Sequence, residues 1–300
     1  MAETWTIGRL IAWTTDYFKS REIESPRLDA EVLLAHLLER DRMYLYVHFD
    51  EPLEEAELAA YREMVRRRAA REPVAYITGV REFMGYDFRV TPATLIPRPD
   101  TETLVEASID GLKRLRERMR GDTEELRFAD IGTGTGAIAL SVLAETADEA
   151  VHGRVCATLV DIAEAALTVA KENAERLGVA DRADFCAGDL LAPLARAGRA
   201  YDAILSNPPY IRADEMAELA PEVRDYEPRT ALTDGGDGLG FYRRLIAEAR
   251  GYMADTAFLA VECGADESET IVELAEAAGW NDVETRKDLA GIERVVIMWK

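Results

Sequence analysis

Four consecutive residues, Asn207-Pro208-Pro209-Tyr210, combine an amide, two rigid prolines and an aromatic ring. They end the run Tyr201–Ser206, which has the pattern of a buried strand. An amide nitrogen is a poor nucleophile because its lone pair is delocalised, so a transfer to it needs acceptors that grip both N–H bonds. The Asn207 side-chain oxygen and the Pro208 carbonyl would each accept one such bond, while Tyr210 packs on the flat amide. Taken alone, the same residues would be read as a proline turn that ends a strand.

A glycine-rich segment upstream predicts a cofactor loop between an apolar strand and a helix. It reads Asp130, Ile131, Gly132, Thr133, Gly134, Thr135, Gly136. The spacing G-x-G-x-G after an acidic residue differs from the G-x-G-x-x-G of dinucleotide-binding proteins, and it favours S-adenosylmethionine over NAD. The N–H groups at the helix start would hold the carboxylate of the methionine moiety, and Asp130 would accept from its ammonium group. A tight turn without a ligand is the alternative interpretation.

Two further acidic residues follow the next two predicted strands. Asp161 ends the strand after the glycine loop, where a carboxylate can bridge the two ribose hydroxyls of a nucleoside. It would otherwise only cap the helix 163–177. Asp189 ends the third strand, and we expect it to contact the adenine amino group, with Leu190 on the adenine face.

The elements that must position these residues indicate an α/β fold, a Rossmann-like domain with a doubly wound sheet. Short apolar runs alternate with helical stretches from residue 126 onward. The seven strand candidates are Leu126–Ile131, Arg154–Asp161, Ala183–Asp189, Tyr201–Asn207, Ala257–Gly264, Asp282–Lys287 and Arg294–Trp299. Before the first of them, Asp100 is a candidate N-cap for a helix that carries Leu104, Ser108 and Leu112 on one face.

The first eighty residues have helical periodicity and predict a separate small domain. Ser25-Pro26 is a plausible N-cap and first-turn pair, and aromatic and β-branched residues around Gly85 predict a hairpin. We therefore expect a helical domain at 1–80, a hairpin linker at 81–97 and the cofactor-binding domain at 98–300.

The amino-acid composition argues against several classes of site and partner. The chain has 300 residues, with 36 basic and 57 acidic side chains and a formal net charge of −21. This charge works against non-specific attraction to nucleic acid phosphates. The three cysteines form no C-x-x-C pair and the three histidines form no cluster, so we expect no disulfide and no metal site. The first residues do not resemble a signal peptide, and no long apolar run exists, so we expect a cytoplasmic protein without a membrane partner.

At this point the chain resembles the release factor glutamine methyltransferases, the HemK-like family, over nearly its whole length. The resemblance rests on several motifs beside the glycine loop and Asn207–Tyr210. These are Glu72-Pro73, Tyr76–Gly79, Ile96–Glu102, Glu227–Arg229, Asp237–Leu239 and Lys287–Gly291. Two positions depart from the family pattern: Leu190 stands where an aromatic residue often covers adenine, and Val261–Gly264 replaces a more usual Glu-Ile-Gly run.

The resemblance implies a helical N-terminal domain that helps to recognise a release factor, and a seven-stranded class I methyltransferase domain whose last strand runs antiparallel. It implies that a monomer methylates the side-chain amide nitrogen (N5) of the glutamine in the Gly-Gly-Gln loop of peptide-chain release factors. Three alternatives stay open. The chain could modify a glutamine of a ribosomal protein, methylate the adenine amino group of a nucleic acid, or bind S-adenosylmethionine without catalysis.

Overall fold

The computed structural model describes residues 4–118, 125–148, 153–198 and 200–300. The chain forms two compact units. The first comprises residues 1–80 together with a short segment, 220–226, that lies far along the chain. The second comprises residues 81–219 and 227–300.

The first unit is helical, as its periodicity predicts. Its helices are α1 (Ile7–Lys19), α2 (Pro26–Leu37), α3 (Arg42–Val47), α4 (Glu55–Ala69), α5 (Val74–Thr78) and α10 (Pro221–Arg224). Ser25 is the N-cap of α2 and Pro26 its first residue. Apolar side chains from five of the helices, among them Phe18, Leu34 and Tyr61, are almost fully buried in one core. The apolar faces of these helices therefore pack against one another.

The segment 220–226 belongs to this unit because of polar contacts with the end of α4. Arg68 has a nearly buried side chain that pairs with Asp29 at 2.7 Å and with Glu222 at 3.1 Å. The Tyr226 hydroxyl donates to the Ala70 carbonyl at 2.6 Å. A buried guanidinium needs such partners, since an unpaired buried charge is costly.

The predicted hairpin is present as β1 (Val80–Phe83) and β2 (Tyr86–Arg89), which form a two-stranded sheet. Met84 and Gly85 make the turn with positive φ angles of 53° and 77°. Phe83 and Phe88 are buried in the larger hydrophobic cluster of the second unit. The hairpin is thus anchored by its aromatic side chains.

The second unit is built on a seven-stranded sheet. The strands are β3 (Leu126–Ile131), β4 (Val155–Asp161), β5 (Ala183–Ala187), β6 (Tyr201–Ser206), β7 (Met253–Glu262), β8 (Asp282–Lys287) and β9 (Glu293–Trp299), in the order β5-β4-β3-β6-β7-β9-β8. The first five run parallel, and β9 is antiparallel to both of its neighbours. All seven predicted strands exist, and the last one is antiparallel as expected.

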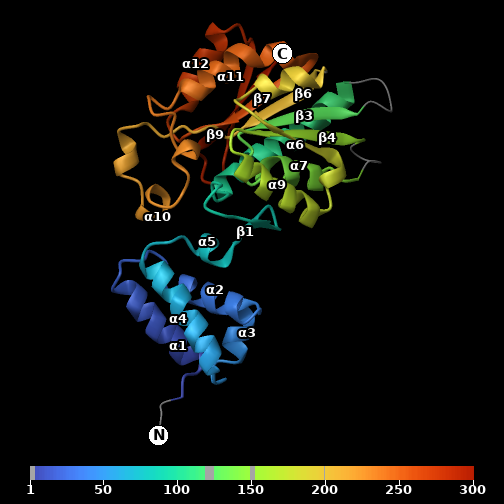
Figure 1. Ribbon diagram of the computed structural model, residues 1–300. Helices are drawn as coiled ribbons and strands as arrows, with labels where there is room; N and C mark the ends of the chain where they lie inside the picture. Colours follow the sequence, from blue (N-terminus) through green and yellow to red (C-terminus); the bar gives the residue numbers. More distant parts are fainter. Residues whose placement is uncertain (1–3, 119–124, 149–152, 199) are drawn as a thin grey trace. The chain divides into compact units, whose positions relative to one another are not determined.

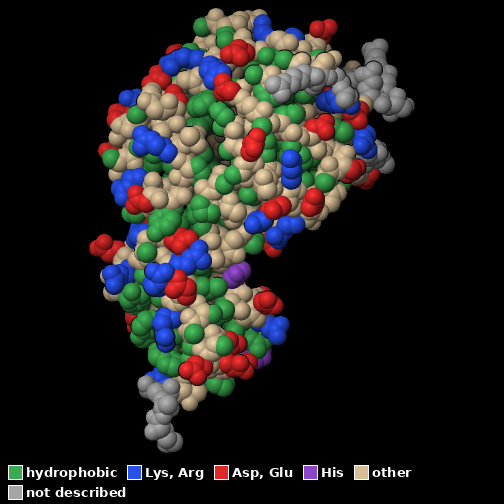
Figure 2. Space-filling model, viewed as in Figure 1, with side chains coloured by type: hydrophobic (Ala, Val, Ile, Leu, Met, Phe, Trp, Pro, Cys, Tyr) green, Lys and Arg blue, Asp and Glu red, His purple; other side chains and the backbone are tan. Residues whose placement is uncertain are grey.

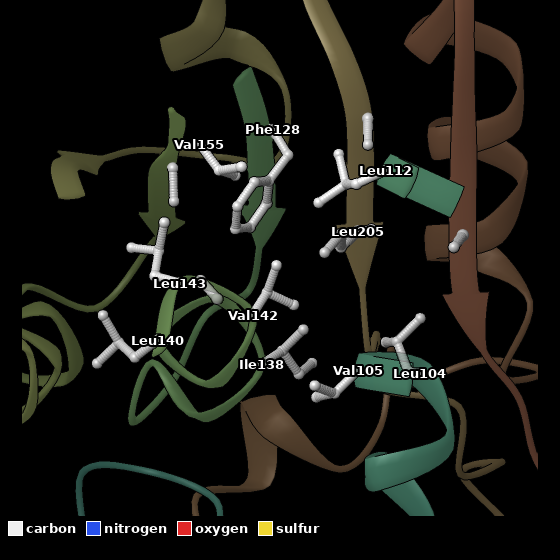
Figure 3. Packing of buried hydrophobic residues seen from close by; sticks show 14 of the residues in the cluster. Leu104, Val105, Leu112, Phe128, Ile138, Leu140, Val142, Leu143, Val155 and Leu205 are labelled. Atoms are coloured by element: carbon white, nitrogen blue, oxygen red, sulfur yellow. The ribbon is translucent and has the colours of Figure 1, made fainter. Parts of the chain in front are cut away.

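Helices cover both faces of this sheet (Figure 1). One face packs against α6 (Glu102–Arg118), α7 (Ala137–Glu145) and α9 (Glu164–Leu177), and the other against α11 (Gly240–Glu248) and α12 (Ser268–Ala277). Figure 3 shows Leu104 and Leu112 of α6 and Ile138 of α7 packed around Phe128 and Leu205 of the central strands. This core holds the carboxyl ends of β3, β4 and β6 at one edge, where the predicted site residues lie.

Several local predictions were wrong by a few residues. β7 runs Met253–Glu262 and not 257–264, so it begins four residues earlier and ends two residues earlier than predicted. β5 ends at Ala187 rather than Asp189, because Gly188 and Leu190 adopt φ angles of 157° and 46° that break the strand. Asp100 lies inside a short 3-10 helix (Pro99–Thr101) and does not cap α6. The helix after Asp161 begins at Glu164, with Ala163 as its N-cap.

Acidic and basic side chains are interspersed on the face drawn in Figure 2, where no large basic patch stands out. None of the helices in the described ranges combines the length and apolar character needed to span a bilayer.

Candidate active site

A cavity of about 370 Å³ opens at the carboxyl edge of the sheet, within the second unit. Its volume suits a small-molecule ligand. Eight of the predicted site residues line it: Gly132, Gly134, Asp161, Asp189, Leu190, Asn207, Pro208 and Pro209. The other five, Asp130, Thr133, Thr135, Gly136 and Tyr210, are not part of the lining. The structure therefore gathers the two predicted motifs around one space, with the remaining residues behind them.

The glycine loop is shaped by positive φ angles at Gly132, Gly134 and Gly136, of 75°, 55° and 81°. A Cβ added at Gly132 or Gly134 would meet open space, whereas one at Gly136 would lie 2.7 Å from Leu140. The first two glycines therefore let a ligand approach the backbone, and the third lets the helix pack closely.

Most N–H groups of this loop already have acceptors in the protein. Gly132 and Thr133 both donate to the Val160 carbonyl, at 2.8 and 3.0 Å. Gly134 donates to Asp161 at 2.9 Å, and Gly136 donates to Thr133. The row of free donors at this loop is thus shorter than the sequence predicted.

Asp130 is fully buried beneath the loop. One carboxyl oxygen accepts from the Thr133 hydroxyl at 2.6 Å, while Oδ1 has no hydrogen-bond partner in the described structure. Burial raises the pKa of Asp130 to about 7, although hydrogen bonds from Thr133 and the Ala139 N–H act in the opposite direction. A buried acceptor without a donor is what a ligand ammonium group would satisfy.

Asp161 organises the loop from the neighbouring strand. Its two carboxyl oxygens accept from the Gly134 and Ala163 N–H groups, both at 2.9 Å. Each oxygen has a second lone pair available to hydroxyl donors in the cavity. Capping of the local turn and ribose binding are therefore compatible at Asp161.

Asp189 and Leu190 also line the cavity. The Asp189 carboxylate pairs with both terminal nitrogens of Arg244, at 3.2 and 2.6 Å. Arg244 belongs to α11 and also lines the cavity. The carboxylate predicted to contact adenine thus already has a cationic partner, while Leu190 packs against the core and presents its remaining surface to the cavity.

The Asn207–Tyr210 turn is fixed to the glycine loop and to the start of α6. The Ser206 hydroxyl, one residue before the turn, donates to the Ile131 carbonyl at 2.7 Å. The Asn207 amide group donates to Thr101 Oγ1 at 3.3 Å. Tyr210 packs against the core beside the turn, and burial raises its pKa to about 12. Tyr210 is therefore a neutral ring near the turn and not a general base.

Two motifs that are distant in sequence meet at the same edge. Glu227 is nearly buried, and its carboxylate accepts from the Ile96 N–H at 3.2 Å and from Arg98. These two hydrogen bonds hold the segment before α6 against the connection that follows β6. It places Pro228 and Leu95 in the wall of the cavity.

A second connection is folded around Asp234. Its carboxylate accepts from the N–H groups of Gly236, Gly238 and Gly240, at 2.8, 3.2 and 2.8 Å. Burial alone would raise the Asp234 pKa, but these three donors together lower it. Gly238 has a φ of 81°, and a Cβ there would lie 2.2 Å from the Tyr210 carbonyl oxygen. This loop therefore supports the reactive turn from behind.

Several residues that line the cavity were not predicted from the sequence. Among them are Thr94, Leu95, Ile162, Phe241 and Arg244. Ile162 directly follows Asp161 and is 70% exposed, so an apolar residue after a strand-ending acid was the available signal. The others come from distant segments, and no local pattern links them to the glycine loop.

Comparisons with known proteins find relatives of both parts of the chain. Residues 9–79 match the PrmC N-terminal domain, and residues 110–237 match the methyltransferase small domain. A release factor glutamine methyltransferase of Geobacter sulfurreducens is 42% identical over 98% of this chain and 96% of its own length. One of Rhodopirellula baltica is 41% identical over 100% of both chains.

Among solved structures, the N-terminal domain of human METTL16 is similar with a TM-score of 0.50 and 17% identity, covering 83% of this chain and 84% of that one. This likeness concerns the fold alone. The two full-length relatives, together with the matched N-terminal and methyltransferase domains, show that the chain belongs to the release factor glutamine methyltransferase family.

Proposed function

We propose that this protein transfers a methyl group from S-adenosylmethionine to the side-chain amide nitrogen (N5) of the glutamine in the Gly-Gly-Gln motif of peptide-chain release factors. The observation that carries the proposal is one cavity that joins the glycine loop and Asp161 to the Asn207–Pro209 turn. Family membership supplies the identity of the acceptor.

The site fits S-adenosylmethionine. The unpartnered Oδ1 of Asp130 suits the ammonium group, and the open space beside Gly132 and Gly134 lets the ligand lie against the backbone. Asp161 would hold the ribose hydroxyls, with Ile162 and Leu190 near the base. When bound, this cofactor supplies an electrophilic methyl group on a sulfonium.

The residues of the turn would grip and aim the acceptor. Asn207 Oδ1 and the Pro208 carbonyl each accept one N–H bond of the glutamine amide, which draws electron density onto its nitrogen and fixes its direction. Pro209 stiffens the turn, and Tyr210 would pack on the amide plane. No strong base is needed at this step, since the N–H bonds become more acidic only once the new bond to nitrogen forms.

We further propose that the helical unit recognises the release factor, because any glutamine offers the same amide and selectivity must come from elsewhere. In this unit α3 and the residues after it expose Met43, Tyr46, Val47 and Phe49, with exposed fractions of 67, 48, 72 and 46%. Exposed apolar side chains grouped in this way are typical of a protein-binding surface. Because translation factors act in the cytoplasm, we also propose a cytoplasmic location.

The proposal is tested with labelled S-adenosylmethionine and four acceptors: a release factor, the same factor with glutamate in place of the Gly-Gly-Gln glutamine, a ribosomal protein and a nucleic acid. We expect label only in the first, with at least a hundredfold loss in an Asn207→Ala variant, about the effect of a misaimed reactant. Label in the glutamate-substituted factor, or mainly in another acceptor, would overturn the assignment.

A further inference from the structure

A buried carboxyl group with no role so far lies behind the reactive turn. Glu262 is the last residue of β7 and is only 2% exposed. Its Oε2 atom has no hydrogen-bond partner within the described ranges of the chain. Burial raises the pKa of its carboxyl group, while hydrogen bonding from the Thr101 and Asn207 side chains and the positive charge of Arg294 on β9 lower it. A carboxylate kept in such a place needs an explanation, because its burial is costly.

The hydrogen-bonding groups around Asn207 determine the orientation of its side-chain amide. Its Nδ2 group donates to Thr101 Oγ1 at 3.3 Å. A carboxylate is an acceptor only, so the Thr101 hydroxyl must donate to Glu262 and accept from Asn207. In a chain of this polarity the N–H end of the Asn207 amide faces inward and Oδ1 faces the cavity.

We propose that Glu262, acting through Thr101, is a positioning residue that holds the Asn207 amide with its oxygen toward the reacting nitrogen. The inference deepens the proposed function and rests on it, since Asn207 is the group that would grip the acceptor. A flipped Asn207 would present two donors to an amide N–H and would repel it.

The protonation of Glu262 sets the direction of this chain. Burial raises its pKa to about 7, while Thr101 and Arg294 act to lower it and Asp100 to raise it. The other titratable groups that face it are Tyr210, Tyr242 and Cys263, whose pKa values burial raises to about 12 or above. Those three stay neutral near pH 7. Once protonated, Glu262 can itself donate to Thr101, and the inward orientation of the Asn207 N–H end is lost.

The experiment compares Glu262→Ala and Glu262→Gln with wild type in the full chain. A matched control is Glu293→Gln on β9, whose carboxylate also accepts from hydroxyl groups, those of Ser268 and Thr285, away from the turn. Steady-state kcat and KM for the release factor, the cofactor Kd by calorimetry and the pH profile of kcat are measured for each. Each carboxyl variant is also made in an Asn207→Ala background.

We expect Glu262→Ala to lower kcat about 100-fold, as a misplaced reactant does, with KM and cofactor Kd near wild type. In the Asn207→Ala background it should change kcat by no more than about twofold, the range within which unrelated effects add. Wild-type kcat should fall as the pH drops below about 7 when it is measured at saturating cofactor, so that protonation of Asp130, whose pKa is also about 7, does not limit the rate through cofactor binding. Glu262→Gln should keep more activity than the alanine variant and lose this acidic limb, and Glu293→Gln should retain it.

Equal losses from Glu262→Ala with and without Asn207 would overturn the proposal, as would an acidic limb that persists in Glu262→Gln. The glutamine variant preserves the side-chain shape, so the pH profile decides even if the alanine variant does not fold. A wild-type enzyme that labels a different acceptor would defeat the proposed function instead, and the same comparison would then be made on that acceptor.

Discussion

Ionisation of the buried Asp130 carboxyl group lowers the stability of the folded protein without ligand, and Asp130→Asn should remove this loss. Its pKa rises from 3.8 to about 7 because the carboxyl is fully buried. At about 1.4 kcal/mol per pH unit, ionising it in the folded state costs roughly 4 kcal/mol of stability above pH 7. The folded state holds a proton that the unfolded state has lost between these two pKa values, so stability falls as pH rises through this window. Asparagine has the same shape and no such loss.

Chemical denaturation of the full chain at several pH values measures this difference. The stability of Asp130→Asn relative to wild type should increase by roughly 2 kcal/mol between pH 5.5 and 8.5, the part of the cost that develops in that range. The variant should also bind S-adenosylmethionine about 10- to 100-fold more weakly, because a charge-assisted hydrogen bond to the ammonium group is lost. Asp184→Asn, an exposed carboxyl on β5, is the control. A pH-independent difference, or unchanged affinity, would refute the reasoning.

Three further changes test other parts of the structure. Asp161→Ala should weaken cofactor binding about 10- to 100-fold by calorimetry, since it removes ribose acceptors and the support of the loop; unchanged affinity would leave Asp161 with a capping role only. Gly238→Ala should lower kcat more than cofactor affinity, because the new Cβ would meet the Tyr210 carbonyl oxygen at 2.2 Å, and wild-type turnover would show that the loop yields freely. Arg68→Ala should destabilise the helical unit by about 3–5 kcal/mol in thermal or urea unfolding, as it leaves the buried Asp29 without its cationic partner, while Glu222 keeps Arg71; a loss below about 1 kcal/mol would mean that water reaches Asp29.

The sequence predicted those features that depend on local pattern. The seven strands, the glycine loop and the Asn207–Tyr210 turn follow from runs of apolar residues and from glycine and proline positions, because backbone sterics act over a few residues. Strand ends were less certain: the break after Ala187 depends on positive φ angles that no residue type there demands, apart from Gly188.

Local sequence patterns could not predict the contacts between distant segments. Glu262 stands in an apolar run and has no local signal of its role, since its partners Thr101 and Asn207 lie in other elements. Likewise, the sequence around Arg244 in α11 does not indicate that its side chain pairs with Asp189. Polar partners of this kind are chosen by tertiary packing and not by spacing along the chain.

The segment 220–226, which completes the helical unit, also sets an order of events during synthesis. The ribosome releases residues 1–80 first, and domains generally fold as they emerge. Arg68 must then wait for Glu222, which follows more than a hundred residues later, after most of the sheet has been made. The first unit of the chain to appear is therefore among the last to be finished, and a nascent chain that stops before residue 220 would carry an incomplete helical unit in which Arg68 has Asp29 as its one carboxylate partner among the described residues.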